Sequence, residues 1–321
     1  MRESDVLVDP VLEEMEHDLA GLQVVALGGG HGLAGALQAI LDYAGGLTAV
    51  VTVADDGGSS GRLSSALGIP PPGDIRRALL AMSPEPSVWR DLMEFRFEEA
   101  DVAGHSLGNL IIAALTSLSG SFEDALDTIG RLLGARGAVV PAAPVPLVLE
   151  AAVDGEVVSG QVAIARSHGR ISDVRVKPAD AQAGRRALDA IAFADQIVLG
   201  PGSLFTSVIA GLRVPGIAEA VNASRGRLVY VCNLTTQDGE TLGMSGPDHV
   251  AALAEVGRIR PPDAVVTHDG PLVVPSGLTR VTVEDGEIAG TPVFAGDVAD
   301  PRADWPRHDP TRLGAVLRRL A

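Results

Sequence analysis

The sequence predicts an α/β fold with a Rossmann-like, mostly parallel sheet, a helical insertion and a small β-rich segment. Residues 22–27 (LQVVAL) form an apolar run that ends in glycines, and apolar residues at helical spacing follow over residues 33–44. Residues 47–53 are apolar and β-branched without alternation, which is typical of a strand buried on both faces of a parallel sheet. These observations predict a βαβ unit at the start of the fold.

The remaining elements follow along the chain. Apolar residues at helical spacing between 74 and 135 predict a helical insertion. The pattern over 138–177 predicts a small β-rich segment of short strands, one of them over residues 157–165, with a hairpin turn at Asp154 and Gly155. Beyond it the pattern indicates a helix over 180–192, strands before the turn at 200 and over 227–233, a helix over 247–257, strands near 263–267 and 278–283, and a helix from 310. We expect one domain over residues 21–321, preceded by an N-terminal extension over 1–20.

Composition narrows the class of ligand. The 321 residues carry a net charge of −16, and Lys177 is the only lysine among 25 basic residues. We therefore expect no nucleic-acid or membrane-surface binding, and backbone N–H groups and individual arginines must hold any anionic ligand. The single cysteine, Cys232, excludes an intramolecular disulfide and a multi-cysteine zinc site, and the absence of a Gly-Lys-Ser/Thr motif excludes a P-loop NTPase. Residues 1–20 lack the apolar stretch of a signal peptide, so we expect a cytoplasmic protein without membrane insertion.

The first candidate loop is GGGHG, which contains Gly28, Gly29, Gly30, His31 and Gly32. Glycines let the backbone approach a ligand closely, and the N–H groups that follow point out of a helix N-terminus, so phosphate is the expected ligand. The spacing of Gly30, Gly32 and Gly35 also fits the dinucleotide fingerprint. A tight strand-to-helix turn without a ligand is the alternative.

The second candidate loop is ADDGGSSGRL, and its polar or glycine positions are Asp55, Asp56, Gly57, Gly58, Ser59, Ser60 and Arg62. The adjacent carboxylates can accept hydrogen bonds from ribose or sugar hydroxyls, or hold a Mg²⁺ ion that bridges a diphosphate. An ordinary dinucleotide fold has no such loop here, which argues against a dehydrogenase. A solvated turn is the alternative.

Two predicted helix starts add further candidates. In PPPGDIRRALL, Asp74 is the expected N-cap, and Arg76 and Arg77 lie in the first turn, where a cation opposes the helix dipole. This unfavourable position suggests that one of the two arginines faces an anion such as a phosphate. A solvated arginine is the alternative. In GHSLGNL, His105 is a candidate general base, a diphosphate donor or a structural cap, and Asn109 is a candidate reader of a base edge or a hydroxyl.

Two later strands also end in turns. LGPGS provides Gly200, Gly202 and Ser203, and CNLTTQDGET provides Asn233, Gln237 and Glu240 or is a polar loop without a ligand. Because ligands of open α/β sheets lie across the carboxyl ends of the strands, we expect the loops at 28–32, 54–62 and 200–203 to converge on one crevice.

The ordered motifs GGGHG, ADDGGSSGRL, PPGDIR, GHSLGNL, LGPGS and NLTTQDGET resemble the gluconeogenesis factor family, the UDP-N-acetylglucosamine-binding YvcK proteins of the CofD-like superfamily. The resemblance covers residues 22–270. It implies a Rossmann-like core with a helical addition, a nucleotide diphosphate sugar in the crevice, and a role in cell shape and in growth on gluconeogenic carbon. A related branch transfers a phospholactyl group with Mg²⁺, but its second loop lacks the GGSSGRL and PPGDIR continuation.

The chain departs from that family at several positions. His31 replaces the usual threonine of the first loop, GQV at 160–162 replaces Gly-Glu-Ser, and two positions of NLTTQDGET differ. We expect a regulatory protein that binds UDP-N-acetylglucosamine or UDP-glucose without turnover and requires no cofactor. Two points stay open, whether Asp55 and Asp56 hold a Mg²⁺ ion and whether the chain forms a homo-oligomer. The alternatives are a Mg²⁺-dependent phospholactyl-type transferase, a dehydrogenase, and an interaction protein with a vestigial site.

Overall fold

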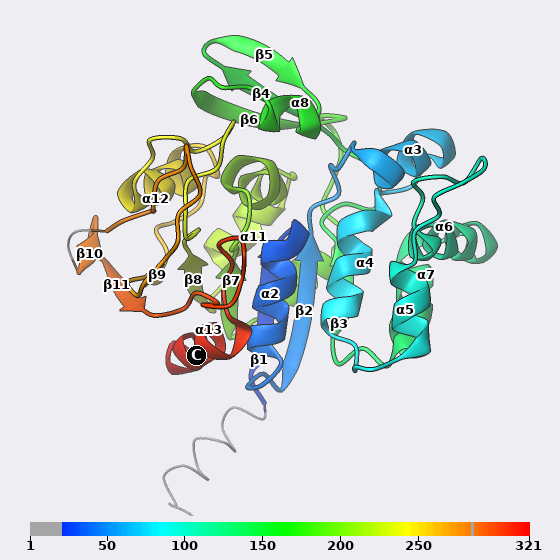
Figure 1. Ribbon diagram of the computed structural model, residues 1–321, viewed down its shortest axis with the longest axis horizontal. Coiled ribbons are helices and arrows are strands. Elements are labelled where there is room, and N and C mark those ends of the chain that lie inside the picture. Colours follow the sequence, from blue (N-terminus) through cyan, green and yellow to red (C-terminus); the bar gives the residue numbers. More distant parts are fainter. Residues whose placement is uncertain (1–20, 284–285) are drawn as a thin grey trace, which may run out of the picture.

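The computed structural model describes residues 21–283 and 286–321, so the expected N-terminal extension lies outside the described residues. Its centre is an eight-stranded sheet in the order β10-β11-β9-β8-β7-β1-β2-β3, in which β10 and β11 are antiparallel and every other neighbouring pair is parallel (Figure 1). The strands of this sheet are β1 (Gln23–Gly28), β2 (Gly46–Val51), β3 (Ala138–Pro141), β7 (Gln196–Leu199), β8 (Arg227–Val231), β9 (Ala264–His268), β10 (Glu287–Ile288) and β11 (Thr291–Gly296). The structure confirms the predicted mostly parallel α/β fold.

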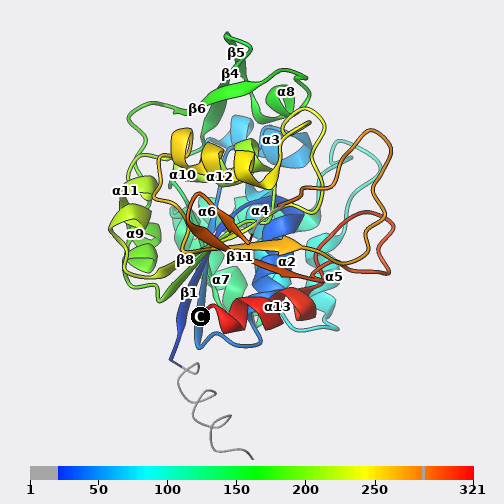
Figure 2. The same ribbon diagram turned by 90° about the vertical axis from the view of Figure 1, so that its left-hand side faces the viewer.

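Helices cover both faces of the sheet. In the side view of Figure 2, α9 and α11 lie on one side of it, and α2 and α13 lie on the other. The described helices are α2 (Gly30–Ile40), α3 (Gly58–Leu67), α4 (Pro72–Ala81), α5 (Val88–Glu94), α6 (Leu107–Ser119), α7 (Phe122–Leu133), α8 (Gln161–Ala165), α9 (Arg185–Ala192), the π-helix η1 (Leu204–Ile209), α10 (Ala210–Leu212), α11 (Ile217–Ala223), α12 (Gly246–Glu255) and α13 (Pro310–Arg319). Covering both faces explains why the central strands are apolar without alternation.

The strand order reverses between β1 and β7. From β1 the chain proceeds outward to β2 and β3, whereas from β7 it proceeds in the opposite direction to β8 and β9. A crevice forms outside the carboxyl ends of the strands at such a switch point, and it is the usual ligand position in open α/β sheets. The glycine loop after β1 and the one after β7 therefore face each other across it.

The helices α3 to α7 fall between β2 and β3, so the predicted helical insertion is confirmed. The predicted β-rich segment over 138–177 is confirmed, and its first strand, β3, belongs to the parallel sheet. A separate antiparallel sheet contains only β4 (Val148–Val153), β5 (Glu156–Ser159) and β6 (Ile171–Lys177). Asp154 and Gly155 form the predicted hairpin turn, with φ angles of 50° and 88°.

Three predicted elements differ from the structure. Residues 161–165 form helix α8 rather than strand, after a break at Gly160 with a φ of 99°. The helix predicted over 180–192 begins at Arg185, because Gly184 before it is extended. Residues 278–283 form no strand of the sheet, because their backbone pairs with the loop after β8, where the Val281 N–H donates to the Leu234 carbonyl at 3.1 Å.

Among the described residues, no single helix combines the length and apolar character needed to cross a membrane. The bent pair Leu204–Leu212 and Ile217–Ala223, with 74° between its halves, reaches that threshold only when both halves are taken together.

Candidate functional site

The loop after β1 leads directly into helix α2 without a side-chain cap. The N-cap is Gly29, and Gly30 has a φ of 67°, which favours glycine at that position. The Gly30 N–H donates to the Asp74 carboxylate at 2.8 Å, but no described residue accepts from the N–H groups of His31 and Gly32. The start of α2 therefore presents two backbone donors to the crevice, which is the geometry of an anion site.

The loops after β1 and β7 lie in direct contact. A Cβ atom on Gly32 would lie 2.3 Å from the carbonyl oxygen of Pro201, so only glycine permits this approach. A Cβ on Gly202 would lie 3.4 Å from the Gly29 carbonyl oxygen. The structure thus brings the two predicted glycine loops together at the switch point.

Asp74 does not cap α4, contrary to the sequence-based expectation. The helix begins at Pro72 with Pro71 as its N-cap, because a proline needs no backbone donor at the first position, and this places Asp74 within the first turn. Its carboxylate accepts from the Gly30 N–H on one oxygen and pairs with the Arg77 guanidinium on the other. Asp74 therefore ties α4 to the first loop and holds Arg77 beside it.

Arg76, the other arginine of that turn, is buried, so the solvated alternative does not hold for it. Its Nε donates to the Asn109 side-chain oxygen at 3.0 Å, and its Nη1 donates to the Met93 carbonyl at 2.9 Å. Burial and the neighbouring Arg77 lower the pKa of Arg76 to about 10. No described carboxylate forms an ion pair with it, so its positive charge is left largely uncompensated beside the crevice.

Ser59, His105 and Asn109 continue the same hydrogen-bond network. Asn109 Nδ2 donates to Ser59 Oγ at 3.1 Å, and Ser59 Oγ lies 3.0 Å from His105 Nδ1. Burial and then the charges of Arg62 and Arg96 lower the pKa of His105, which favours a neutral ring that accepts the Ser59 proton. The network joins α3, α4 and α6, so these predicted site residues also fix the helical insertion.

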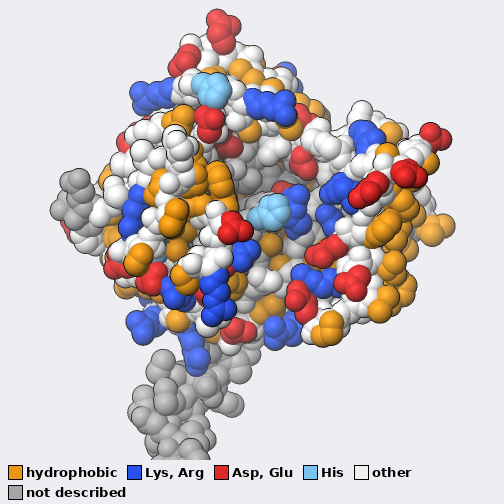
Figure 3. Space-filling view, viewed as in Figure 1, with side chains coloured by type: hydrophobic (Ala, Val, Ile, Leu, Met, Phe, Trp, Pro, Cys, Tyr) orange, Lys and Arg blue, Asp and Glu red, His pale blue; other side chains and the backbone are white. Residues whose placement is uncertain are grey.

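Cationic side chains gather on this side of the crevice. Arg62 Nη2 donates to the Ala103 carbonyl at 2.9 Å, and Arg96 Nη1 donates to the Gly104 carbonyl at 2.7 Å. His31 keeps part of its surface exposed to solvent. The protein around the rest of the ring, and then the charge of Arg77, lowers its pKa. Figure 3 shows arginine or lysine and histidine side chains along one edge of the hollow at the centre of this face. The arrangement concentrates positive charge locally on a chain whose net charge is −16.

The two adjacent carboxylates of the second loop serve different partners. Asp55 Oδ1 accepts from the Gly57 N–H at 2.9 Å, and burial raises the pKa of Asp55. Asp56 Oδ1 accepts from the Val162 N–H at 3.0 Å and so fastens the three-stranded sheet unit to this loop. Asp55 and Ser60 both lie against Gly73, whereas Asp56 lies against Gly160 and α8, so the two carboxylates have different protein neighbours.

Two backbone donors of the third loop already have protein acceptors. The Gly200 N–H donates to the Leu27 carbonyl at 3.1 Å, and the Gly202 N–H donates to the Asn233 side-chain oxygen at 3.1 Å. Gln237 Nε2 donates to Ser203 Oγ at 3.1 Å. The N–H groups of Gly30, Gly200 and Gly202 therefore already have protein acceptors, whereas no described residue accepts from those of His31, Gly32 and Ser203. That the two loops hold a diphosphate through their N–H groups stays a prediction.

Glu240 occupies the start of η1 in the same way. Its Oε2 accepts from the N–H groups of Phe205 and Thr206 at 3.1 and 3.2 Å, and its Oε1 accepts from Thr206 Oγ1 at 2.6 Å. Burial raises the pKa of this carboxyl, which is 8% exposed. The sequence offered Glu240 as a candidate of the loop at 232–241 or as part of a polar loop without a ligand, and no motif indicated that it fills a helix N-terminus.

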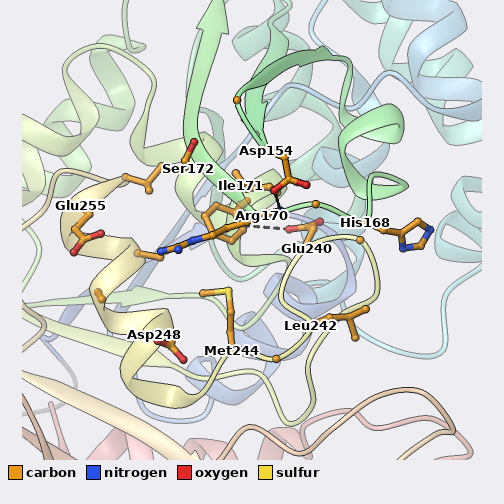
Figure 4. A pocket seen from close by; sticks show the side chains of 18 residues that line it. Asp154, His168, Arg170, Ile171, Ser172, Glu240, Leu242, Met244, Asp248 and Glu255 are labelled. Atoms are coloured by element: carbon orange, nitrogen blue, oxygen red, sulfur yellow. Dashed lines mark hydrogen bonds between the residues drawn. The ribbon is translucent and has the colours of Figure 1, made fainter.

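A cavity of about 840 Å³ lies between the three-stranded sheet and α12, and Glu240 is the one candidate site residue from the sequence that lines it. Figure 4 shows its walls, which come from the β4–β5 turn, residues 168–172, the loop at 239–244 and α12. Phe205 and Glu240 line it too, so it adjoins the start of η1 and the third glycine loop. No local pattern indicates this cavity, because its walls come from segments far apart in the chain.

Similarity to known proteins agrees with this architecture. Residues 24–287 match the family model described as 2-phospho-L-lactate transferase CofD. The chain belongs to the CofD family. It is 38% identical over 308 residues to the gluconeogenesis factor of Bacillus subtilis, covering 92% of this chain and 96% of that relative, and 43% identical over 251 residues to the gluconeogenesis factor of Halalkalibacterium halodurans, covering 78% of each.

A solved structure of a similar protein has the same fold. A crystal structure of a member of the UPF0052 family from Bacillus halodurans superposes with a TM-score of 0.88 at 36% identity and covers 92% of this chain and 98% of that one. The resemblance inferred from the motifs is thus confirmed at the level of the CofD family and its gluconeogenesis factor members.

Proposed function

We propose that this protein binds a nucleotide sugar, UDP-N-acetylglucosamine or UDP-glucose, in the switch-point crevice and acts as a regulator. A role in gluconeogenic carbon metabolism follows from the name of its relatives, and a role in cell shape and the envelope follows from the resemblance of its motifs. The site residues remain predictions in this proposal, and the geometry supports them unequally.

The observation that carries the proposal is the uncapped start of α2. The N–H groups of His31 and Gly32, which have no acceptor in the part of the chain that the structure describes, open into a crevice flanked by Arg76 and Arg77. The chain as a whole is strongly acidic. A helix N-terminus with nearby guanidinium groups suits a phosphate or diphosphate, because aligned backbone donors and forked N–H groups both favour phosphate oxygens.

The other residues then have distinct parts. Asp55, beside the first turn of α3, is placed to accept from a ligand hydroxyl or to share a Mg²⁺ ion with the phosphates, which is how proteins commonly hold this ion. Asp56, Gly202 and Asn233 support the loops rather than the ligand, because their polar groups already have protein partners.

A thermal-shift panel tests the proposal. The full chain is heated with UDP-N-acetylglucosamine, UDP-glucose, GDP, NAD and NADP, each with and without Mg²⁺. A ligand present at about 100 times its Kd stabilises the folded state by about 2.7 kcal/mol, so a UDP-sugar should raise the melting temperature clearly. A shift with NAD and none with any UDP-sugar would contradict the proposal.

A matched pair of variants locates the binding. Arg77→Gln removes a guanidinium beside the first loop, and Arg185→Gln removes an exposed guanidinium from α9. We expect the UDP-sugar shift to shrink strongly in Arg77→Gln and to persist in Arg185→Gln. Equal shifts in both variants would remove Arg77 from the site.

The match to the phospholactyl transferase family model favours a second candidate, a Mg²⁺-dependent transferase that uses a nucleotide diphosphate donor. That activity requires consumption of the donor when an acceptor and Mg²⁺ are supplied. Chromatography of the nucleotides after incubation separates the two functions, since a binding regulator returns the nucleotide sugar intact.

A further inference from the structure

The cavity beside α12 lies on the side of the third glycine loop away from the arginine network. Its volume of about 840 Å³ falls within the range of small-molecule sites. Phe205 and Glu240 belong both to its wall and to the start of η1, which follows loop 200–203 directly. A ligand whose phosphates lie at α2 therefore has this cavity as neighbouring space for one of its ends.

The charges of the cavity oppose those of the first loop. Four carboxylates line it, from Asp154, Glu240, Asp248 and Glu255, against two basic side chains, Arg170 and His168. All of these carboxylates except that of Glu255 also accept from a backbone N–H group of the protein. In Figure 4 the Arg170 side chain reaches across the cavity toward α12, which carries Asp248 and Glu255. A phosphate would meet repulsion here, whereas carboxylates accept hydrogen bonds readily from hydroxyl groups.

The remaining wall is apolar. Phe205, Leu242 and Met244 contribute to it, and Met244 projects into the space shown in Figure 4. A ring with hydroxyl groups at its edge and an apolar face suits such a mixed wall, because its edge can donate to the carboxylates while its face covers the apolar side chains.

We infer that this cavity receives a neutral, hydroxyl-bearing ring of the nucleotide sugar, while the phosphates stay at the start of α2. This inference rests on the proposed function and adds the position and charge of one end of the ligand. Two parts of the ligand have the required chemistry, the glycosyl group and the ribosyl end of the nucleoside. In either case the acidic wall selects against a ring that carries a carboxylate.

A bulky side chain on α12 tests the inference. Ala251 lies on the cavity wall and is exposed, so Ala251→Trp fills the cavity without overpacking the core, and Ala254→Trp places the same side chain on an exposed position of the same helix outside the cavity. Isothermal titration with UDP-N-acetylglucosamine and with UDP should show affinity for the nucleotide sugar about tenfold weaker or more in Ala251→Trp, and unchanged in Ala254→Trp.

The two ligands distinguish the two ends. Weakening of UDP-N-acetylglucosamine alone assigns the cavity to the glycosyl group, and equal weakening of both ligands assigns it to the ribosyl end. If Ala251→Trp weakens neither ligand more than Ala254→Trp does, the inference is wrong although the proposed function stands. If the unmodified protein binds neither ligand, the proposed function itself has failed.

Charge gives an independent readout when the glycosyl group is the occupant. UDP-glucuronate should bind about tenfold more weakly than UDP-glucose, because its carboxylate would face the acidic wall. Glu255→Gln removes one negative charge from that wall and should reduce this difference in affinity. The Glu255 side chain has no hydrogen bond or ion pair among the described residues, so the substitution breaks no such contact. Suppose that Ala251→Trp weakens the binding of UDP-N-acetylglucosamine but not of UDP, so that the glycosyl group occupies the cavity. Equal affinities of the unmodified protein for UDP-glucuronate and UDP-glucose would then show that the acidic wall does not select against a carboxylate.

Discussion

The first and third glycine loops look alike in sequence but differ in what they offer a ligand. Both follow adjacent parallel strands, β1 and β7, and both lead into a helix at the switch point. At the third loop the buried Glu240 carboxylate accepts from the N–H groups of Phe205 and Thr206. At the first loop the Asp74 carboxylate accepts only from the Gly30 N–H and is paired with Arg77, so the N–H groups of His31 and Gly32 have no acceptor among the described residues. A glycine-rich strand-to-helix turn is therefore an anion site only where the rest of the protein leaves its donors free.

The difference also sets the electrostatics of the crevice. Glu240 places a carboxylate with no described cationic partner at the start of η1, whereas at the start of α2 the Asp74 carboxylate is paired with Arg77 and the Arg76 guanidinium lies nearby without an ion pair among the described residues. An anionic ligand is thus directed to one of two similar loops. The third loop then acts as a support that the first loop touches through Gly32 and Pro201.

The largest expected effect comes from removing the Glu240 carboxylate at the start of η1. Glu240→Ala leaves the N–H groups of Phe205 and Thr206 and the Thr206 hydroxyl buried without an acceptor, so the free energy of unfolding should fall by about 3 kcal/mol. Urea denaturation measures this change. Glu240→Gln keeps one acceptor oxygen and should lose less, and equal stability of Glu240→Ala and the unmodified protein would show that the carboxylate does not support the third loop.

The contact between the two loops is the next test. Gly32→Ala sets a Cβ against the Pro201 carbonyl and should cost about 2 kcal/mol of stability and weaken nucleotide-sugar binding. Gly35→Ala, in the same helix with nothing within 4 Å of the added atom, should instead stabilise the protein by about 0.5 kcal/mol. Thermal unfolding of the two variants separates the steric contact at Gly32 from the general effect of alanine on helix stability. A rise in melting temperature in both variants, or a fall in both, would contradict the contact.

Releasing the first loop from α4 should have a smaller effect. Asp74→Ala removes the acceptor of the Gly30 N–H and the partner of Arg77, so we expect a loss of about 1 kcal/mol in stability together with weaker binding of UDP-sugars. Asp74→Asn keeps an oxygen for the Gly30 N–H and should retain more of both. Calorimetric titration of both variants checks the order.

The smallest expected effect concerns the pH dependence of binding. The pKa of His31 is lowered by burial and by Arg77, so the ring is mostly neutral near neutral pH, whereas a bound diphosphate favours the protonated ring. Binding then takes up a proton, and affinity should rise by about threefold as the pH falls from about 8 to about 6. His31→Thr should flatten this dependence, and an unchanged slope in that variant would exclude His31 as its source.

Much of the architecture could be predicted from the sequence because it depends on local patterns. Continuous apolar runs over β1 and β2 predicted buried parallel strands, and Asp154 with Gly155 predicted a hairpin. Local patterns could not show that residues 278–283 form no strand of the sheet, because that backbone pairs with the loop at 234–236 instead.

The sequence by itself determined the parallel sheet, the glycine turns after its strands and the family to which the chain belongs. Only the tertiary structure decided which turn keeps free donors, that Asp56 supports α8, that Arg76 is buried, and that a cavity opens beside α12. The physical reason is that strand and turn formation depend on neighbouring residues, whereas the occupancy of a backbone N–H and the charge around it depend on side chains such as Glu240, whose carboxylate lies 34 residues along the chain from the Thr206 N–H that it binds.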